Sequence, residues 1–202
     1  MDSGVIVAGG RSTRFGDTDK AVAELAGTPM IRRVADRITP VVDEIVVNCR
    51  AGQRAAIAAA LDGVAVTVSF ALDPEPDLGP AAGIATGLRA VEGDYAFVAA
   101  CDMPFVDPGL VAYLFDRAAG HEAAVPRTDG WYQTTHAVYH AVAMAEACGR
   151  ALDDGERRVA AALSRLDYAT VGREEIAARA SMATFENLNT REEFAAAGDR
   201  LD

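Results

Sequence analysis

The order of apolar runs and helical segments in the first hundred residues constrains the fold of this chain most strongly. Continuous apolar runs occur at residues 4–9, 44–48, 64–70 and 95–100, and helix-like segments lie between them. Runs that are apolar throughout, rather than at alternate positions, are typical of strands covered on both faces. The resulting βαβαβ order predicts an α/β fold of Rossmann-like type, with a mostly parallel sheet and helices on both faces.

The second half of the chain has a less regular pattern. A strand at 134–140 is expected to pair in antiparallel fashion with 121–127 through a turn around Asp129 and Gly130. This would add one antiparallel strand region to the sheet. No linker, repeat or low-complexity tract interrupts the chain, so a single domain spanning residues 1–202 is expected. Helices are expected at 29–38, 54–62, 81–91, 106–120, 155–166 and 189–201.

Composition and charge exclude several classes of function. The net charge of -11 would repel nucleic acid and anionic membranes. No apolar run has the length of about 18 residues that a membrane span needs, and no basic stretch precedes the first apolar run as in a signal peptide. The three cysteines are widely spaced and form no CxxC pair, which argues against a disulfide framework or a cysteine zinc site. We therefore expect a cytoplasmic protein without nucleic-acid or membrane partners.

Lysine is nearly absent from the chain. Of the 19 basic residues 18 are arginine, and Lys20 is the only lysine. An acidic, lysine-poor composition indicates a halophilic protein from a high-salt cytoplasm, although a GC-rich genome would also favour arginine and alanine. Loss of structure below about molar salt would separate the two explanations. The retained Lys20 indicates a position where arginine would not serve, such as one where a compact ammonium follows a phosphate oxygen.

The loop after the first strand has the composition of a phosphate-binding loop. In open parallel sheets, ligands bind beyond the carboxyl ends of the strands. Gly9 and Gly10 let the backbone approach a ligand closely, while Arg14 and Lys20 supply positive charge. The loop matches neither GxxxxGK[ST] nor GxGxxG. From these residues alone, a strand-to-helix turn with surface arginines is as well supported as a phosphate site.

Three later strands are each followed or ended by a polar residue. Asn48 and Asp73 suit hydrogen bonds to a base or a sugar, and Asp102 suits a divalent metal that bridges phosphate oxygens. Each residue taken alone is also common in turns or helix caps. Together with the basic loop they favour phosphoryl or nucleotidyl transfer, in which the protein aligns the reactants and neutralises charge.

The chain resembles a known family at this point. VAGGRSTRFGDTDK resembles the nucleotidyltransferase signature LAGGxxxRMGxxDK, with Val7 in place of Leu and Phe15 in place of Met. The segments LAGTPMI, GPAAGI, CDMPF, GERRV and FENLNTREEF follow in order. From residue 4 to about 196 the chain resembles the molybdenum cofactor guanylyltransferases.

The resemblance implies a GT-A-type nucleotidyltransferase fold and a specific reaction. Members of the family transfer GMP from GTP to the terminal phosphate of molybdopterin and release pyrophosphate. The implied cofactor is Mg²⁺, with Mn²⁺ as an alternative. Proteins of molybdenum cofactor biosynthesis or insertion are further expected partners.

The resemblance also implies roles for individual residues. Asp102 would bind the metal, and the catalytic group would comprise Arg14, Lys20 and Asp102. Arg157 and Arg158 fit either the pterin side of the site or a solvated helix face. The nucleotide would contact Val7, Ala8, Gly9, Gly10, Lys20, Asn48, Asp73 and Asp102, and the acceptor Asn187 and Asn189.

Two alternative functions and one alternative metal site remain open from the sequence. A related enzyme that uses CTP or another phosphorylated acceptor would share the first signature. A nucleotide-binding module without catalysis is a further alternative, disfavoured because Arg14, Lys20 and Asp102 are all present. His136 and His140 share one face of a predicted strand, which fits a metal pair but also an ordinary strand.

Overall fold

A computed structural model describes residues 1–10, 19–74 and 78–200 of the chain. One sheet dominates it, with strand order β10-β7-β9-β6-β1-β4-β5 and β8 paired to β7. A hairpin of β2 and β3 forms a second, small sheet. The strands are β1 (Asp2–Val7), β2 (Glu24–Leu25), β3 (Thr28–Pro29), β4 (Glu44–Cys49), β5 (Thr67–Leu72), β6 (Tyr95–Ala100), β7 (Ala123–Thr128), β8 (Trp131–Tyr132), β9 (His136–His140) and β10 (Tyr168–Val171).

Strand directions confirm the predicted mostly parallel sheet. β1 pairs in parallel with β4 and β6, β4 with β5, and β7 with β10. β9 lies antiparallel between β6 and β7, which confirms the predicted antiparallel region. The predicted turn was partly wrong, because Asp129 and Gly130, with φ of 50° and 87°, connect β7 to β8 rather than to β9. Residues with positive φ at both positions favour a tight hairpin, so the chain turns back at once.

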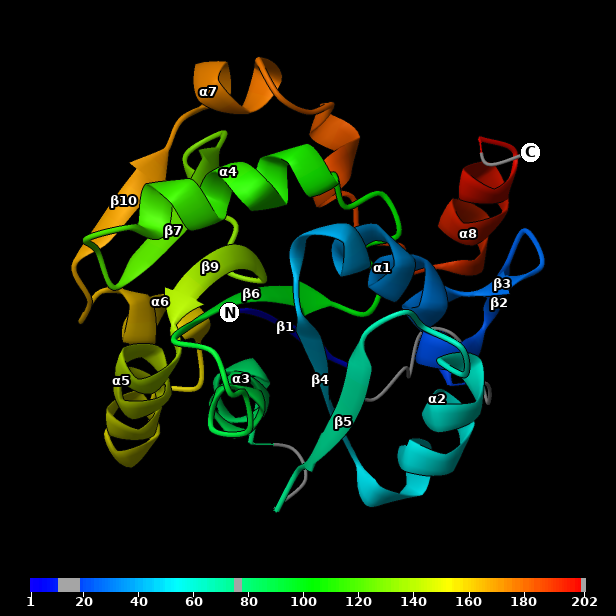
Figure 1. Cartoon of the computed structure of the whole chain (residues 1–202), viewed down its shortest axis with the longest axis horizontal. Helices are drawn as coiled ribbons and strands as arrows, with labels where there is room; N and C mark the ends of the chain where they lie inside the picture. Colours follow the sequence, from blue (N-terminus) through cyan, green and yellow to red (C-terminus); the bar gives the residue numbers. More distant parts are fainter. Residues whose placement is uncertain (11–18, 75–77, 201–202) are drawn as a thin grey trace.

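Helices cover both faces of the sheet (Figure 1). α1 (Met30–Ile38), α2 (Arg54–Ala60), α4 (Pro108–Ala118) and α7 (Arg173–Ala177) bury apolar side chains in one core cluster. α3 (Pro80–Leu88), α5 (Ala141–Asp153) and α6 (Val159–Leu163) do so in a second cluster. α8 (Arg191–Gly198) packs near the β2–β3 hairpin in a third, smaller cluster. In the part of the chain that the structure describes, no helix is both long and apolar enough to cross a membrane.

Some predicted boundaries were wrong, for identifiable reasons. The strand expected at 64–70 is β5, which begins only at Thr67, where the pairing with β4 begins. The helix expected at 155–166 is the shorter α6, because the left-handed Gly155 follows the end of α5 and Arg158 caps α6. Arg157 and Arg158 therefore precede this helix instead of lying on it. α5 and the β2–β3 hairpin were not predicted.

Close packing of α3 brings its first turn to the carboxyl edge of the sheet. A Cβ atom on Gly83 would lie 2.5 Å from Asn48 Oδ1, and one on Gly87 would lie 2.5 Å from Val5 Cγ1. Both glycines are therefore required for the helix to approach β1 and β4 this closely. Gly79, with φ of 89°, caps the helix, and Pro80 begins it.

Candidate functional site

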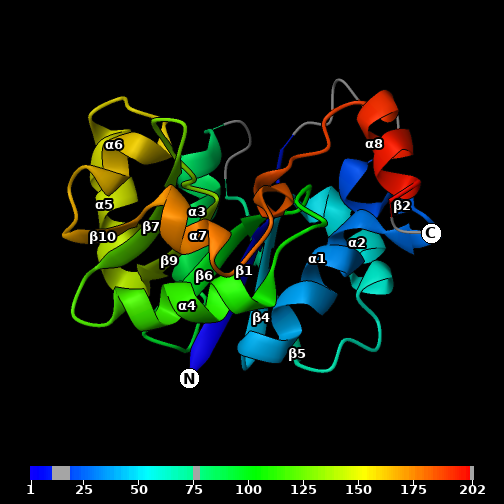
Figure 2. The same cartoon turned by 90° about the horizontal axis from the view of Figure 1, so that it is seen from above.

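The candidate site lies where β1, β4 and β6 end side by side. The amide N–H of Ala8 donates to the Asn48 carbonyl at 2.8 Å, and that of Cys101 donates to the Val7 carbonyl at 3.1 Å. The backbone register thus fixes the ends of three strands relative to one another. Figure 2 shows the N-terminus at the opposite end of the molecule from α6 and α8. The residues predicted at the ends of these strands lie at one edge of the sheet because neighbouring parallel strands end there.

Asn48 and Asp73 form one side of the site. Asn48 Nδ2 donates to Asp73 Oδ1 at 2.7 Å and to the Ala71 carbonyl at 3.2 Å. Asn48 Oδ1 is buried and has no hydrogen-bond partner among the described residues. A methyl group at Gly9 would overlap the Asp73 carboxylate, so glycine is required there, whereas Gly10 faces open space. This side presents an unused buried acceptor beside a carboxylate, an arrangement suited to N–H or O–H donors of a ligand.

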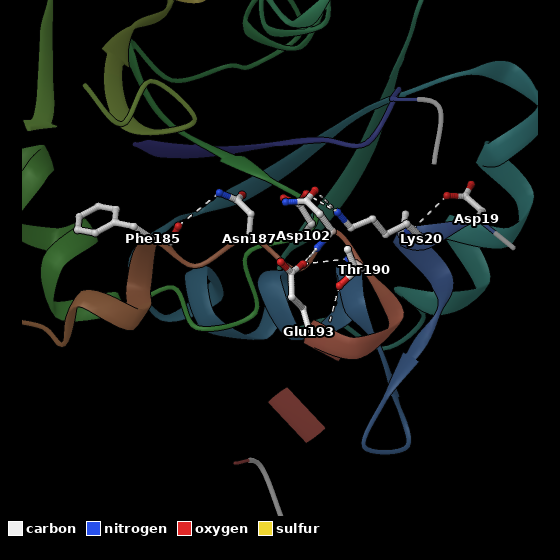
Figure 3. A network of polar contacts seen from close by, with 9 residues as sticks. Asp19, Lys20, Asp102, Phe185, Asn187, Thr190 and Glu193 are labelled. Carbon is white, nitrogen blue, oxygen red and sulfur yellow. Dashed lines mark hydrogen bonds and ion pairs between the residues drawn. The ribbon is translucent and has the colours of Figure 1, made fainter. Parts of the chain in front are cut away.

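Lys20 occupies the centre of the site (Figure 3). Its ammonium donates to Asp102 Oδ2 at 2.6 Å and to Asn189 Oδ1 at 2.9 Å. Lys20 begins a short 3-10 helix (Lys20–Val22) capped by the side chain of Asp19, and only 9% of the residue is exposed. A charge this poorly hydrated needs a partner, and the Asp102 carboxylate supplies it.

Asp102 has an oxygen that fits a divalent cation. Its Oδ1 atom is buried and has no hydrogen-bond partner among the described residues, while Oδ2 accepts from Lys20. Carboxylate oxygens are the preferred ligands of Mg²⁺, which usually completes its shell with water and substrate phosphates. Within residues 1–10, 19–74 and 78–200, no group of three or more His, Cys, Asp or Glu side chains gathers to hold a metal. A metal at Asp102 would therefore rely on such external ligands.

Asn187 and Asn189 lie on the segment that precedes α8. The Leu188 amide between them donates to the Asp102 carbonyl at 3.0 Å, which joins this segment to the loop after β6. Asn189 reaches Lys20, as described above. Asn187 is exposed, and its Nδ2 atom donates to the Phe185 carbonyl at 3.4 Å (Figure 3). The fold thus brings Asn189, 169 positions along the chain from Lys20, to the Lys20–Asp102 ion pair.

Gln53 is a buried polar residue of the site that the sequence did not reveal. Its Nε2 atom donates to the Ala8 carbonyl at 3.0 Å and to Asp19 Oδ2 at 2.8 Å, while Oε1 accepts from the Arg50 amide at 3.0 Å. The side chain therefore joins the ends of β1 and β4 to the cap before Lys20. The only signal was a glutamine among alanines before α2, which has no distinctive spacing.

The two histidines of β9 have separate structural roles. His136 is fully buried, with ring centroids 5.0 Å from Phe97 and 4.8 Å from Phe185. Burial lowers its pKa from 6.5 to about 3, so the ring is neutral. His140 caps α5 by accepting from the Ala143 amide at 3.3 Å. These contacts fit the ordinary strand that was the alternative to a metal pair, with His136 in the core and His140 as a helix cap.

The cysteines are free thiols without a role in the site's chemistry. Burial raises the pKa of Cys49 to about 11 and that of Cys148 to about 12, and burial together with Asp102 raises the pKa of Cys101 further. A thiol must ionise to act as a nucleophile, so all three remain inert near neutral pH.

The sequence analysis considered three arginines as candidates for the site, and each has a different outcome in the structure. Arg14 falls within 11–18, outside the described residues, so its predicted role stays a prediction. Arg158 pairs with Glu156 at 3.4 Å on the surface. Arg157 lies against Gly79 at the start of α3, with its Cβ atom 3.2 Å from where a Cβ of Gly79 would be.

Comparisons with known proteins show the family of this chain. Residues 4–167 match the MobA-like NTP transferase domain. A probable molybdenum cofactor guanylyltransferase from Natronomonas pharaonis is 51% identical over 98% of both chains, and one from Haloferax mediterranei is 39% identical over 98% of this chain and 93% of its own. Both organisms are halophiles, in agreement with the acidic, lysine-poor composition.

A solved structure has the same fold across nearly the whole chain. The molybdopterin-guanine dinucleotide biosynthesis protein A from Archaeoglobus fulgidus superposes with a TM-score of 0.78, at 26% identity and 98% coverage of both chains. The family match covers well over half of the chain, and it includes the ends of β1, β4, β5 and β6. The chain therefore belongs to the MobA-like nucleotidyltransferases, among the molybdenum cofactor guanylyltransferases.

Proposed function

We propose that this protein transfers GMP from GTP to the terminal phosphate of molybdopterin. An oxygen of the pterin phosphate bonds to the α-phosphorus of GTP, the bond from that phosphorus to the bridging oxygen breaks, and pyrophosphate leaves with the electron pair. The observation that carries the proposal is the Lys20 ammonium, held between Asp102 at 2.6 Å and Asn189 at 2.9 Å. This cation joins the strand ends to the segment before α8, where two anionic substrates would have to meet.

The strand ends are proposed to hold the nucleotide. The backbone of Val7, Ala8, Gly9 and Gly10 would lie along GTP. Asn48 and Asp73 would receive hydrogen bonds from the nucleoside, which the unpartnered Asn48 Oδ1 supports. Backbone and amide groups fixed by a sheet need little reorganisation on binding, so they favour a defined pose for the α-phosphate.

Charge at the reaction centre is proposed to come from Lys20, Arg14 and a divalent cation on Asp102. Mg²⁺ fits this oxygen, and Mn²⁺ would also fit. When bound, such a cation offsets charge on the phosphates. Lys20 would turn from Asp102 toward the phosphates and stabilise the leaving pyrophosphate. The attacking phosphate is already ionised at neutral pH, so neither His136 nor His140 is needed as a base.

The acceptor is proposed to bind beside Asn187 and Asn189, across Lys20 from the nucleotide. Residues 1–202 would act as a single nucleotidyltransferase domain in the cytoplasm, a setting consistent with the three free thiols. Transfer of the product to proteins of cofactor biosynthesis or insertion stays a prediction.

A product assay in concentrated potassium chloride tests the proposed function. Purified protein, Mg²⁺ and molybdopterin are combined with each of the four nucleoside triphosphates, and pyrophosphate and the pterin product are followed by mass. A guanylylated pterin formed only with GTP is the expected result. A cytidylylated product would replace the base assignment, and GTP binding without product would favour a module that does not catalyse transfer.

A further inference from the structure

We infer that Glu193 is a positioning residue for the transfer reaction, because it holds Asn189 against the Lys20 ammonium. The inference rests on the proposed function for its kinetic consequences, but the contact itself does not. Glu193 lies on the exposed first turn of α8, where its carboxylate accepts hydrogen bonds from the Asn189 and Thr190 amides. The Lys20 ammonium also attracts this carboxylate directly, but this attraction is the smallest of the causes that lower the pKa of Glu193. Its effect would pass through the backbone of the segment before the helix.

The Glu193 carboxylate ties down two consecutive peptide groups (Figure 3). Its Oε2 atom accepts from the Asn189 amide at 2.5 Å and from the Thr190 amide at 2.9 Å. In return, Thr190 Oγ1 accepts from the Glu193 amide at 3.2 Å. The second and third contacts form an ordinary capping box, which stabilises the start of a helix. The first contact reaches one residue further back and has no role in capping.

The additional contact fixes the residue that binds Lys20. On one side of Asn189, the Leu188 amide is bonded to the Asp102 carbonyl at 3.0 Å. Glu193 holds the Asn189 amide itself and, on the other side of Asn189, the Thr190 amide. With both neighbouring peptide groups fixed, the Asn189 side chain is aimed at Lys20 Nζ, 2.9 Å away. Without Glu193, the Leu188 backbone bond and the buried Leu188 side chain would still restrain the segment, but the Asn189 and Thr190 amides would lose their acceptor.

The charge of Glu193 suits this task. Hydrogen bonds from the Asn189 and Thr190 amides are the largest causes that hold its pKa below the usual value, so it is ionised at neutral pH. Hydrogen bonds from N–H groups to a carboxylate are roughly twice as strong as neutral ones. Glutamine would keep an acceptor oxygen without the charge, and alanine would remove both. The contact should therefore be weakened in the glutamine variant and lost in the alanine variant.

The single lysine gives a direct measurement of the contact. Protein labelled with ¹⁵Nζ-lysine has one side-chain ammonium resonance, that of Lys20. We expect Glu193→Ala to speed exchange of its protons with water by about fivefold to tenfold, the factor that one hydrogen bond of about 1 kcal/mol represents. Glu193→Gln should fall between this variant and the wild type. Glu192→Ala, which removes the same charge from the same exposed helix turn, should leave exchange unchanged.

The kinetic test separates positioning from simple helix stability. Glu193→Ala should lower kcat and raise KM for molybdopterin by about fivefold to tenfold, while KM for GTP changes less than about twofold because the strand-end contacts remain. Glu193→Gln should recover part of the loss. A lower melting temperature with unchanged kcat, KM and Lys20 exchange would overturn the inference, as would an equal effect of Glu192→Ala.

The two proposals fail in distinguishable ways. If wild-type protein makes no guanylylated pterin, the proposed function fails, and Lys20 exchange in the Glu193 variants still decides the inference. If the wild type is active and the Glu193 variants match Glu192→Ala in both measurements, the inference alone fails. Should Glu193→Ala not fold, Glu193→Gln against Glu192→Gln provides the same comparison.

Discussion

Two halves of the proposed site are held in place by different kinds of interaction. The nucleotide half comprises the ends of β1, β4 and β5, where strand pairing and the buried side chains of Asn48 and Gln53 fix the strand ends relative to one another. The acceptor half is the segment from Phe185 to Glu193. It is held by one backbone bond to the Asp102 loop, by the buried Leu188 side chain, by the ion pair of Glu186 with Arg200, and by hydrogen bonds to the first turn of α8.

This difference shows how one fold can combine a rigid and an adjustable side. The sheet edge cannot shift without breaking long rows of hydrogen bonds, so it suits a substrate that must be placed the same way every time. The acceptor half depends on a few local bonds and can be tuned by single residues. Lys20 and Asp102 lie where the halves meet, and changes there should have the largest effect.

Replacing Asp102 should abolish transfer. Asp102→Ala removes both the partner of Lys20 and the proposed metal ligand, so we expect kcat to fall by about a thousandfold or more. Pyrophosphate release with GTP and molybdopterin measures the loss. Asp102→Asn keeps the shape and should be equally inactive with an unchanged circular dichroism spectrum. Activity within tenfold of wild type in either folded variant would remove Asp102 from the centre of the site.

Replacing Lys20 by arginine should slow the reaction although the charge is kept. A planar guanidinium cannot make the short contacts of a compact ammonium to Asp102 and Asn189, so we expect a loss of about tenfold to a hundredfold in kcat. The surface variant Arg32→Lys makes the reverse exchange away from the site and should be neutral. Wild-type rates for Lys20→Arg would show that the single lysine was retained by chance.

Loss of Gln53 should damage the nucleotide half selectively. Gln53→Leu leaves the Ala8 carbonyl, Asp19 and the Arg50 amide without their partner, at a cost of about 1–3 kcal/mol in the free energy of unfolding. We expect KM for GTP to rise by about tenfold while KM for molybdopterin changes little. Gln133→Leu, which removes a hydrogen bond to Thr128 of β7, outside the nucleotide half, serves as the matched control. An equal rise in both KM values would show that the halves are not independently built.

The buried His136 should make the fold sensitive to acid. Its folded pKa of about 3 lies below the ordinary 6.5, so the unfolded chain binds the extra proton between these values and stability falls as pH drops through that window. From pH 7 to pH 5 the loss should be about 2 kcal/mol. Denaturant unfolding of wild type, His136→Gln and the exposed His121→Gln measures it. If His136→Gln keeps the full pH dependence, other groups cause it.

The nucleotide half could be predicted well from the sequence, and the acceptor half only through resemblance. Continuous apolar strands ending in Asn48, Asp73 and Asp102 determine which loops meet, because parallel strands present their carboxyl ends at one edge. Asn189 meets Lys20 only through packing of α8 near the β2–β3 hairpin, a contact between elements far apart in the chain.

The remaining residues have no local sequence signal. Gln53 acts through three hydrogen bonds to positions that only the fold brings near. Glu193 was not predicted as a site residue, because its bond to Asn189 depends on the path of the segment before α8. The start of α6 is set by the backbone conformation at Gly155 and Arg158. The residue types at these two positions do not indicate where the helix begins.

The resonance of the single lysine tests most directly whether the two halves meet at Lys20. ¹⁵Nζ-lysine protein is titrated first with Mg²⁺ and a GTP analogue whose α–β bridging oxygen is a methylene group, which blocks cleavage, and then with molybdopterin. We predict a shift of the Lys20 resonance with the analogue and a second shift with the pterin. A resonance that neither ligand moves would contradict the account, since Lys20 would then lie outside the site of transfer.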